Sequence, residues 1–462
     1  MTPLSVGAVV EVAVTDLLTS GQGIGRAVGM VVFVWGPLPG ERARVRIAQR
    51  KPKYAIAELV ELLTFSSQRA VPFCPVFGRC GGCQLQHLTY EGQLAWKRSM
   101  VESALRRIGH VKPLTVCKTV GMEFPQAYRN KMALVVARGQ DGVGFGFYRA
   151  RSHDVVTIEA CPVVRPQLDR TIAALWEVAR RPQTAPAFRA VKHVVARAGG
   201  ANDLVASFTT QHPSPELRER GSAVSAALPG ASGLTNSYGL AGANAVLGRK
   251  SVTVAGRPQT TEEIEGLSFR VSPSSFFQVN SEMVASIFRF LAPRVPPGSR
   301  ILDLYCGVGT FSLFFARLGA RVTGIEESAE AVREAKRNAD SNGLGPAITF
   351  LRGRVEQVVH EDRVVAALGE TDIAFLDPPR KGSDEAVLRA LCSAGISHVW
   401  YLSCNPATLA RDVAVLVQGA YEIDVVQPFD MFPHTGHVEA FVALRKPTAP
   451  PLGFADEARG AH

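Results

Sequence analysis

Residues 300 to 312 read Arg300-Ile301-Leu302-Asp303-Leu304-Tyr305-Cys306-Gly307-Val308-Gly309-Thr310-Phe311-Ser312. An apolar run enters a turn that contains two glycines, and the residues after the turn can begin a helix. Strand, glycine turn and helix in this order are typical of nucleotide-binding α/β folds, in which the backbone approaches the ligand closely. We therefore predict a Rossmann-like α/β domain over residues 276–447.

Three later apolar segments of this domain end in residues that can do chemistry. Val322-Thr323-Gly324-Ile325 leads to Glu326, Ile373-Ala374-Phe375-Leu376 to Asp377, and Val399-Trp400-Tyr401-Leu402-Ser403 to Cys404. The carboxyl ends of strands border the ligand crevice of an open α/β sheet. Glu326, Asp377 and Cys404 are therefore expected at that crevice.

The glycine turn indicates which cofactor the crevice binds. Gly307 and Gly309 allow close approach of the backbone, and Glu326 can accept hydrogen bonds from both ribose hydroxyls. No third glycine completes G-x-G-x-x-G, which disfavours a dinucleotide. The form D-x-x-C-G-x-G, beginning at Asp303, instead resembles the first motif of class I S-adenosylmethionine methyltransferases.

Two further motifs bear on the methyl acceptor. Amino-group methyltransferases carry a similar Asp-Pro-Pro followed by an aromatic residue, but here Asp377-Pro378-Pro379 is followed by Arg380. A lone cysteine at a strand end is either a small buried hydrophobe or a nucleophile. As a nucleophile, Cys404 could add to C6 of uracil and make C5 reactive, and a base must then remove the C5 proton. Glu439 is the first candidate base, and His434 and His437 are its rivals.

The N-terminal residues 1–63 alternate apolar and polar positions between glycine-rich turns, which predicts a small β-barrel of about five strands. Between Arg42 and Lys53 six basic residues follow one another without an acid, and the chain has a formal net charge of +10. We favour an RNA-binding barrel over an oligomerisation module, because basic barrels of this kind follow nucleic-acid backbones.

The chain has eight cysteines, and three of them form C-x5-C-x2-C at Cys74, Cys80 and Cys83. Thiolates on one loop suit zinc or an iron–sulfur cluster, and either requires a fourth donor. Cys161 is the best candidate because Cys161-Pro162 repeats the Cys-Pro pair at Cys74, whereas Cys117 lies in an apolar run and is expected to be buried. The loop belongs to a predicted strand-rich central domain, residues 64–275. Its helix Thr89–Gly109 is expected to pack on the catalytic domain.

The remaining sequence features concern location and assembly. No apolar run approaches the roughly 20 residues that span a bilayer, and the N-terminus lacks a secretion signal, so we expect a cytoplasmic protein. Residues 448–462 are predicted to be disordered. We expect a monomer without an obligatory protein partner.

Taken together, these motifs resemble the RNA uracil-5-methyltransferase family, most closely its ribosomal branch, the 23S ribosomal RNA uracil-C5 methyltransferases. The resemblance runs from Val6 to Lys446. It joins a TRAM-like barrel, a cysteine loop, and the motifs at Asp303–Gly309, Asp377–Arg380, Ser403–Pro406 and Gly436–Glu439.

The resemblance implies 5-methyluridine formation in 23S ribosomal RNA with S-adenosylmethionine as cofactor. It implies Cys404 as nucleophile, Glu439 as proton acceptor, and a cofactor site at Gln278, Tyr305, Gly307, Gly309, Thr310, Glu326 and Asp377. It also implies a [4Fe–4S] cluster held by Cys74, Cys80, Cys83 and Cys161. Two differences from the family pattern are Thr310, where some relatives carry Asn, and Arg352-Gly353-Arg354, where many class I enzymes place an acid.

Three other functions compete with this one. A radical enzyme would need C-x3-C-x2-C before a (β/α) barrel, which the sequence lacks. A noncatalytic RNA-binding assembly factor would not need Cys404 and Glu439. Transfer RNA as substrate is the nearest alternative, and by the family pattern the barrel and cysteine loop favour ribosomal RNA.

Overall fold

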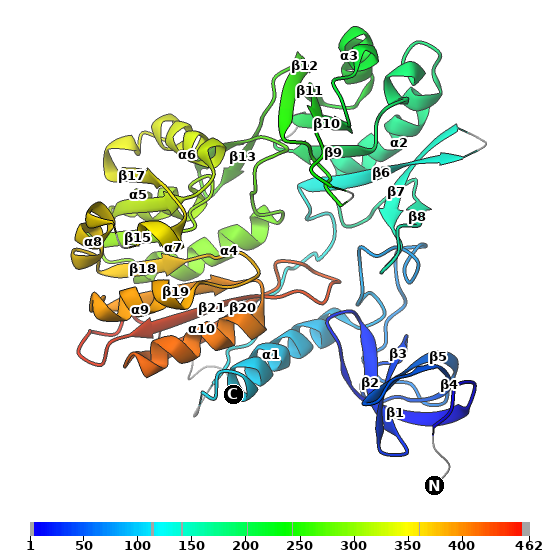
Figure 1. Cartoon of the computed structure of the whole chain (residues 1–462), viewed down its shortest axis with the longest axis horizontal. Coiled ribbons are helices and arrows are strands. Elements are labelled where there is room, and N and C mark those ends of the chain that lie inside the picture. Colours follow the sequence, from blue (N-terminus) through cyan, green and yellow to red (C-terminus); the bar gives the residue numbers. More distant parts are fainter. Residues whose placement is uncertain are drawn as a thin grey trace. The chain divides into compact units, whose positions relative to one another are not determined.

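The structure is a computed structural model, and it describes residues 4–454 except 112–114, 140–141, 201, 243 and 360. The chain forms two compact units, whose elements are labelled in Figure 1. Unit 1 contains the described residues of Met1–Lys97, Tyr148–Val156 and Phe432–His437. Unit 2 contains those of Arg98–Phe147, Thr157–Met431 and Val438–His462. Each unit is therefore built from segments that are far apart in the sequence.

Unit 1 begins with a closed five-stranded barrel whose strands follow the order β1-β2-β3-β5-β4. The strands are β1 (Val9–Leu17), β2 (Gln22–Ala27), β3 (Met30–Trp35), β4 (Arg42–Arg50) and β5 (Tyr54–Leu62). In β4 the buried Ala43, Val45 and Ile47 alternate with exposed arginines, because successive side chains of a strand point to opposite faces. The predicted small barrel is confirmed.

Two of the basic residues of β4 have acidic partners on neighbouring strands. Arg42 pairs with Glu11 of β1 at 2.7 Å, and Arg44 pairs with Glu61 of β5 at 2.8 Å. Both acids come from strands that hydrogen-bond to β4 on either side. The run of basic residues is thus partly neutralised across the sheet, which a linear reading of the sequence does not reveal.

Helix α1 (Tyr90–Arg107) begins in unit 1 and ends in unit 2, close to the predicted Thr89–Gly109. Its C-terminal half supplies Val101 and Leu105, which are fully buried in a hydrophobic cluster with Leu409 and Ala410 of the α/β domain. This half of the helix therefore packs into the core beside α10.

Unit 2 contains two large sheets. The first has seven strands in the order β12-β11-β10-β9-β6-β7-β8. Its strands are β6 (Lys131–Gly139), β7 (Gly142–Tyr148), β8 (Val155–Thr157), β9 (His193–Ala198), β10 (Leu204–Thr210), β11 (Ala231–Tyr238) and β12 (Lys250–Gly256). The accompanying helices are α2 (Pro166–Arg180), η1 (Ala185–Phe188) and α3 (Pro215–Ala227).

The second sheet follows the order β17-β16-β15-β18-β19-β21-β20. Its strands are β15 (Arg300–Leu304), β16 (Arg321–Glu326), β17 (Ile348–Arg352), β18 (Ile373–Leu376), β19 (His398–Ser403), β20 (Glu422–Phe429) and β21 (Glu439–Arg445). The first five run parallel, and β21 is antiparallel to both of its neighbours. The predicted Rossmann-like domain is confirmed.

Helices cover this parallel sheet, as such sheets require. They are α4 (Ser281–Leu291), η2 (Ala292–Arg294), α5 (Thr310–Arg317), α6 (Ala329–Ser341), η3 (Gly345–Ala347), α7 (Val355–Val358), α8 (Asp362–Gly369), α9 (Glu385–Ser393) and α10 (Pro406–Gln418). A hairpin of β13 (Thr260–Ile264) and β14 (Leu267–Val271) precedes them. It is fixed to α6 by the side-chain amides of Asn338 and Asn342, whose oxygens accept from backbone N–H groups at 2.9 Å.

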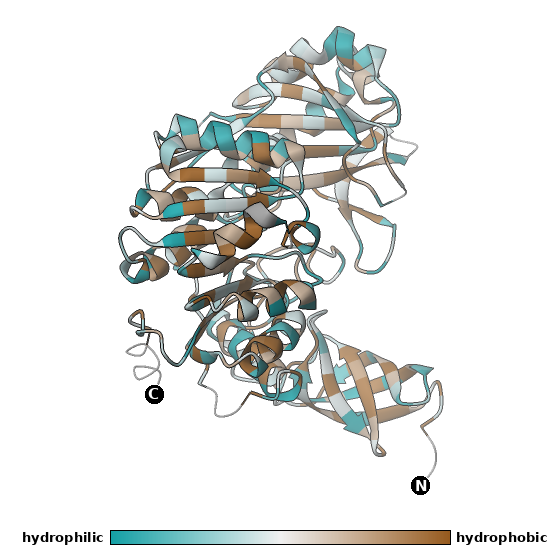
Figure 2. Ribbon diagram, turned by 60° about the vertical axis from the view of Figure 1, so that its left-hand side comes forward, coloured by the Kyte–Doolittle hydropathy of each residue, from teal (hydrophilic) through white to brown (hydrophobic). Residues whose placement is uncertain are grey.

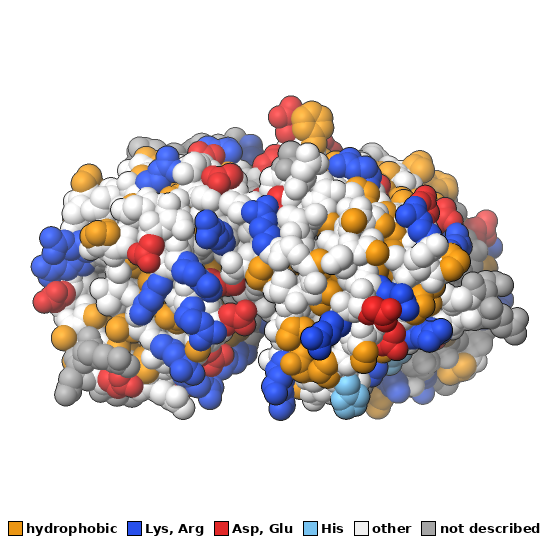
Figure 3. Space-filling model, turned by 90° about the horizontal axis from the view of Figure 1, so that it is seen from above, with side chains coloured by type: hydrophobic (Ala, Val, Ile, Leu, Met, Phe, Trp, Pro, Cys, Tyr) orange, Lys and Arg blue, Asp and Glu red, His pale blue; other side chains and the backbone are white. Residues whose placement is uncertain are grey.

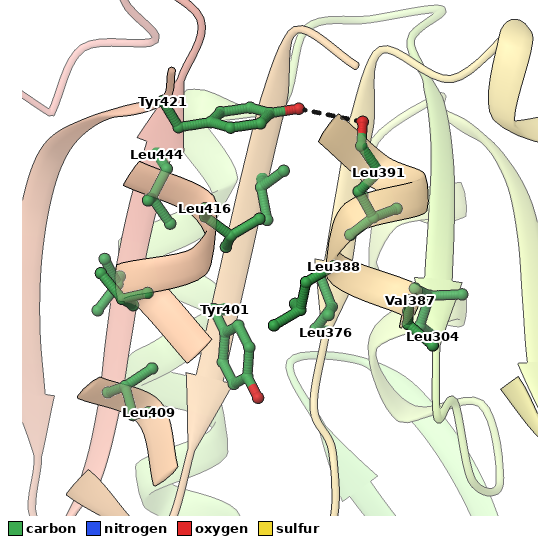
Figure 4. Packing of buried hydrophobic residues seen from close by; sticks show 14 of the residues in the cluster. Leu304, Leu376, Val387, Leu388, Leu391, Tyr401, Leu409, Leu416, Tyr421 and Leu444 are labelled. Atoms are coloured by element: carbon green, nitrogen blue, oxygen red, sulfur yellow. Dashed lines mark hydrogen bonds between the residues drawn. The ribbon is translucent and has the colours of Figure 1, made fainter. Parts of the chain in front are cut away.

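The core of the α/β domain lies between the sheet and helices α9 and α10. Leucines of both helices and of the strands interdigitate there, and the Tyr421 hydroxyl lies at the end of the cluster, 3.5 Å from the backbone oxygen of Leu391 (Figure 4). Figure 2 shows the inner strands of this sheet as largely apolar while the helices carry a hydrophilic outer face. This burial fixes the strand ends at which the candidate site residues lie.

The chain after Lys446 is ordered as far as Phe454, so the predicted disorder of residues 448–462 is wrong for that part. Phe454 is buried against Phe290, Trp400 and Phe441 with ring centroids 5.7–5.8 Å apart. The His398 Nε2 atom also lies 2.9 Å from the Pro450 carbonyl, so side-chain contacts hold a segment whose composition suggests disorder. Residues 455–462 lie outside the described residues.

Within the described part of the chain, no helix combines the length and apolar character needed to cross a membrane. Figure 3 shows one face of the molecule, on which Lys and Arg side chains gather more densely than Asp and Glu. This distribution agrees with the net charge of +10.

Candidate active site

The candidate site residues of unit 2 lie at the carboxyl edge of the parallel strands. Tyr305 follows β15, Glu326 ends β16, Asp377 follows β18 and Cys404 follows β19. Leu304 pairs with Leu376, and Leu376 pairs with Tyr401, so β15, β18 and β19 end at nearly the same level. The fold thus brings residues that are up to 99 positions apart in sequence to one edge.

Cys404 and Glu439 lie next to each other across two antiparallel strands. The last pair of the β19–β21 ladder joins Ser403 to Ala440, so Cys404 and Glu439 occupy the next position outward on each strand. Burial, followed by the negative charges of Glu439 and Asp377, raises the pKa of the Cys404 thiol to about 11. The Arg380 guanidinium acts in the opposite direction because it favours the thiolate.

Glu439 is almost entirely buried, with 2% of its surface exposed. Its Oε1 atom has no hydrogen-bond partner among the residues that the structure describes. Burial, and then the charge of Asp377, raise its pKa well above the usual value, while Arg380 lowers it. A buried carboxylate oxygen without a partner is costly, and here it lies beside a thiol at the edge where ligands bind.

Asp377 is the second buried acid of this edge. Burial raises its pKa to about 7, and a hydrogen bond from the side-chain amide of Gln278 opposes the rise. The Gln278 Nε2 atom lies 3.5 Å from Asp377 Oδ2. Gln278 comes from the segment before α4, which places it close to the acceptor motif although 99 residues separate them.

The glycine turn has the backbone geometry that the sequence predicts. Gly307 (φ +57°) and Gly309 (φ +86°) adopt left-handed conformations, and Tyr305 does so as well (φ +67°), which is unusual for a residue with a side chain. A Cβ atom on Gly309 would meet Leu313 Cδ1 at 2.8 Å, whereas one on Gly307 would meet no atom within 4 Å. Gly309 thus permits helix packing, and Gly307 faces open space where a ligand can approach.

Glu326 holds this turn together. Its carboxylate accepts hydrogen bonds from the backbone N–H of Gly307 at 3.2 Å and of Ser328 at 2.7 Å. Each oxygen keeps a second lone pair, so the carboxylate can still accept from ribose hydroxyls. Thr310 begins α5 directly after the turn and is buried. Arg354, near the position where many class I enzymes place an acid, pairs with Glu327 at 3.6 Å.

A hydrogen-bond network supports the loop that follows Asp377. Asp412 of α10 accepts through Oδ2 from the Tyr401 hydroxyl at 2.5 Å and from the Ser383 N–H at 2.9 Å. The Ser383 hydroxyl in turn lies 3.2 Å from the Tyr305 hydroxyl. The acceptor loop and the glycine turn are therefore connected through Ser383, and sequence reasoning missed Ser383, Tyr401 and Asp412. A charged residue among the apolar positions of α10 was the available signal.

Two separate parts of the chain match known families. Residues 3–60 match the TRAM domain, and residues 259–447 match the tRNA (uracil-5-)-methyltransferase family. A protein of Halalkalibacterium halodurans described as an uncharacterized RNA methyltransferase is 35% identical over 451 residues, which is 96% of this chain and 98% of the relative. One of Thermosynechococcus vestitus with the same description is 36% identical over 95% of this chain and 98% of the relative.

The chain belongs to the RNA uracil-5-methyltransferase family. Its fold is also similar to the crystal structure of the Pyrococcus abyssi tRNA (uracil-54, C5)-methyltransferase in complex with S-adenosyl-L-homocysteine. The TM-score is 0.73 and the identity 25%, over 94% of this chain and 100% of the other.

The cysteines of this RNA methyltransferase are divided between the units. Cys74, Cys80 and Cys83 belong to unit 1 and Cys161 to unit 2. The Gly82 N–H points to the Cys80 sulfur at 3.4 Å, and the Cys161 N–H donates to Asp169 at 2.6 Å. Within the described ranges, no group of three or more His, Cys, Asp or Glu side chains is arranged to hold a metal ion. The iron–sulfur ligand set therefore stays a prediction. Cys117 is buried, as expected.

The two rival bases of the methyltransferase lie in unit 1, whereas Cys404 and Glu439 lie in unit 2. The His434 ring is buried, with Nδ1 3.2 Å from the Gln93 amide and its centroid 4.9 Å from that of Phe73. The His437 ring packs edge-on against Phe432 at 6.0 Å. Of the three predicted bases, Glu439 is the one that unit 2 itself places beside the thiol.

Proposed function

We propose that this RNA methyltransferase transfers the methyl group of S-adenosylmethionine to C5 of a uridine in 23S ribosomal RNA. The observation that carries the proposal is the pair of Cys404 and Glu439, which are neighbours in the β19–β21 register. The charge of Asp377 raises the pKa of both groups. A thiol and a buried carboxylate are the two groups that conjugate addition to uracil and later proton removal require.

The reaction would proceed through a covalent adduct. Cys404, which is partly exposed, loses its proton to solvent, and the thiolate adds to C6 of uracil. The C5–C6 π electrons then move toward O4 and make C5 nucleophilic. Glu439 takes the proton from the methylated C5, the C5–C6 double bond forms again, and the C6–S electron pair returns to Cys404.

The donor would occupy the edge formed by the glycine turn. When bound, S-adenosylmethionine supplies a methyl group on a sulfonium, which leaves as a neutral thioether. Glu326 would hold the ribose, Gly307, Gly309 and Thr310 would border it, and Asp377, Gln278 and Tyr305 would lie around the methionine part. The open space at Gly307 and the remaining lone pairs of Glu326 fit such a ligand.

The assignment to ribosomal RNA rests on analogy, and the comparisons favour a second candidate. A transfer RNA methyltransferase is similar in structure over 94% of this chain. The residues outside this match are too few to contain the whole barrel at residues 3–60, so the match includes at least part of it. The barrel alone therefore does not separate the two substrates. Mapping 5-methyluridine in ribosomal and transfer RNA from a strain that lacks the protein decides between them.

The covalent mechanism is tested with RNA that contains 5-fluorouracil. After addition and methyl transfer, fluorine at C5 cannot leave as a proton, so a denaturation-resistant adduct should persist. We expect the adduct with the wild type and none with Cys404→Ala, with Cys392→Ala as a control at another half-buried cysteine. An adduct that survives in Cys404→Ala would refute the assignment of the nucleophile.

The further properties proposed for the chain follow from the sequence. The four cysteines at positions 74, 80, 83 and 161 would hold a [4Fe–4S] cluster, and no step of the mechanism above depends on it. Arg46 and Arg50 form no ion pair within the described part of the chain and would face RNA phosphates along β4. We expect a cytoplasmic monomer.

A further inference from the structure

The segment Ser272–Asn280 precedes α4 and carries Gln278, whose Nε2 atom lies 3.5 Å from Asp377 Oδ2. It forms neither helix nor strand, so its backbone carbonyls need partners outside a regular ladder. Several of these partners come from the sheet that contains β6 and β9, which belongs to unit 2 together with the α/β domain. The position of Gln278 therefore depends on residues outside the α/β domain.

Asn130, directly before β6, holds two consecutive carbonyls of this segment. It is fully buried, and its Nδ2 atom donates to the Gln278 carbonyl at 3.0 Å and to the Ser281 hydroxyl at 3.1 Å. Its backbone N–H donates to the Val279 carbonyl at 2.9 Å, and its own carbonyl accepts from the Ala198 N–H at 2.9 Å. One residue thus connects the backbone at Gln278 to β9.

Arg197 of β9 determines which way the Asn130 amide faces. Its guanidinium donates to Asn130 Oδ1 at 3.3 Å, and a guanidinium has no acceptor. The amide oxygen must therefore face Arg197, and the NH2 group must face the Gln278 carbonyl. Arg197 is itself almost fully buried, donates to the Ser275 carbonyl at 3.4 Å and lies 5.7 Å from the centre of the Phe277 ring. The same cation thus orients the amide and contacts the segment.

Two further cations contact the ends of the segment. Lys131 of β6 donates from Nζ to the Pro273 carbonyl at 2.7 Å. Arg165 pairs with Glu262 of β13 and donates to the Ser281 hydroxyl at 3.2 Å. Cations that are removed from water are costly unless they are hydrogen-bonded, so these contacts favour one conformation of the segment.

We propose that Asn130 is a positioning residue of the donor site, which acts by holding Gln278 so that its amide meets Asp377. The proposal rests on the function proposed above, in which Gln278 and Asp377 lie around the methionine part of S-adenosylmethionine. It gives the strand-rich domain a role in donor binding. Cys404 is supported separately, by β19 and α10, so loss of this role should weaken donor binding more than it impairs addition by Cys404.

The full-length variant Asn130→Asp tests this role. A carboxylate keeps an acceptor for Arg197, but it cannot donate to the Gln278 carbonyl and repels it. We expect S-adenosylmethionine, titrated by calorimetry without RNA, to bind about tenfold more weakly, the effect of about one lost hydrogen bond. Asn236→Asp is the matched control and should keep wild-type affinity, because Asn236 is a buried asparagine of β11 in the same sheet whose amide donates to the Phe208 carbonyl.

The same titration in a Gln278→Ala background shows whether Asn130 acts through Gln278. If it does, Asn130→Asp should lose most of its tenfold effect there, because two changes that remove one interaction are not additive. A merely structural role would weaken donor binding equally in both backgrounds, and that result would overturn the proposal. Unchanged affinity in Asn130→Asp would overturn it as well. Asn130→Ala, which adds no charge, replaces Asn130→Asp if that variant does not fold.

Adduct formation separates this proposal from the proposed function. With RNA that contains 5-fluorouracil and a saturating amount of donor, Asn130→Asp should form the adduct at the rate of Asn236→Asp, and a slower rate would contradict the proposal. A wild type that binds S-adenosylmethionine but forms no adduct would refute the proposed function. Equal effects in the two Gln278 backgrounds would refute only the role of Asn130.

Discussion

Ser403 pairs with Ala440 at the end of the β19–β21 ladder, and this pair brings a nucleophile candidate and a base candidate together. The two strands are antiparallel in an otherwise parallel part of the sheet. The reversal matters because it brings the start of β21 to the edge where the parallel strands end. Cys404, which follows β19, and Glu439, which begins β21, thus become neighbours.

Glu439→Gln should retain addition and methyl transfer but lose proton removal. We expect a covalent adduct to accumulate with ordinary RNA and turnover to fall by about 10²–10⁴-fold, the usual contribution of a positioned base. Denaturing gels with labelled RNA measure the first effect and methyl incorporation the second. His437→Gln is the control, and wild-type turnover in Glu439→Gln would instead make a histidine the base.

Alkylation of Cys404 should be slow at neutral pH in the ligand-free protein. The thiolate is the reactive form, and the raised pKa of about 11 keeps the group protonated until the pH is well above 9. Glu439→Gln removes a negative neighbour, so it should lower this pKa and speed alkylation at pH 8. Mass spectrometry of the peptide that contains Cys404, after timed reaction with iodoacetamide, measures the rate. An unchanged rate would mean that Glu439 carries no charge beside the thiol.

Asp377→Asn should change how stability depends on pH. The folded-state pKa of Asp377 is about 7 against an ordinary 3.8, so between these values the folded state keeps a proton that the unfolded state has lost. The contribution is fully present below pH 3.8 and is lost as the pH rises through 7. Asp377→Asn should therefore gain stability relative to the wild type between pH 4 and 7. Urea unfolding at several pH values tests this, and parallel curves would contradict it.

Tyr401→Phe should disturb both stability and donor binding. Removing the hydroxyl leaves buried Asp412 with one partner fewer, which costs about 1–3 kcal/mol. Because Ser383 links this network to Tyr305, the KM for S-adenosylmethionine should also rise. Tyr421→Phe is the matched control, since its buried hydroxyl donates to the Ile396 carbonyl at 2.7 Å and has no connection to the turn. Equal KM values in both variants would contradict the expectation.

Iron and sulfide analysis tests the cysteine prediction. Protein purified without oxygen should contain about four iron and four sulfide per chain if four thiolates hold a cluster. Cys80→Ala should lose both. Stoichiometric zinc without visible absorbance would rule the cluster out.

The sequence predicts those parts of the fold in which pattern and burial agree. The strands that lead to Glu326, Asp377 and Cys404 are continuous apolar runs, as buried parallel strands require. By contrast the sequence of β11 does not indicate a strand, since its buried Thr235, Asn236 and Ser237 are residues typical of a loop. Asn236 tolerates burial because its amide donates to the Phe208 carbonyl at 2.9 Å, a contact that depends on tertiary structure.

Dependence on tertiary contacts also distinguishes the site residues that the sequence predicts from those that it does not. Cys404 and Glu439 stand in recognisable motifs, and their register follows from the sheet. Asp412 follows Arg411 and reads as part of a solvated pair, whereas the structure buries it to 1% exposure. The acids that neutralise Arg42 and Arg44 lie 31 and 17 residues away, a distance that local pattern reading does not cover.

Helix α1 has a consequence for modularity. Its first turns, with Gln93 and Lys97, belong to unit 1, while Val101 and Leu105 complete the core of the α/β domain. A catalytic domain cut out at residue 276 would lose that apolar cover and expose leucines and valines to water. Recombination that exchanges the barrel between relatives can therefore succeed only with a crossover placed before α1.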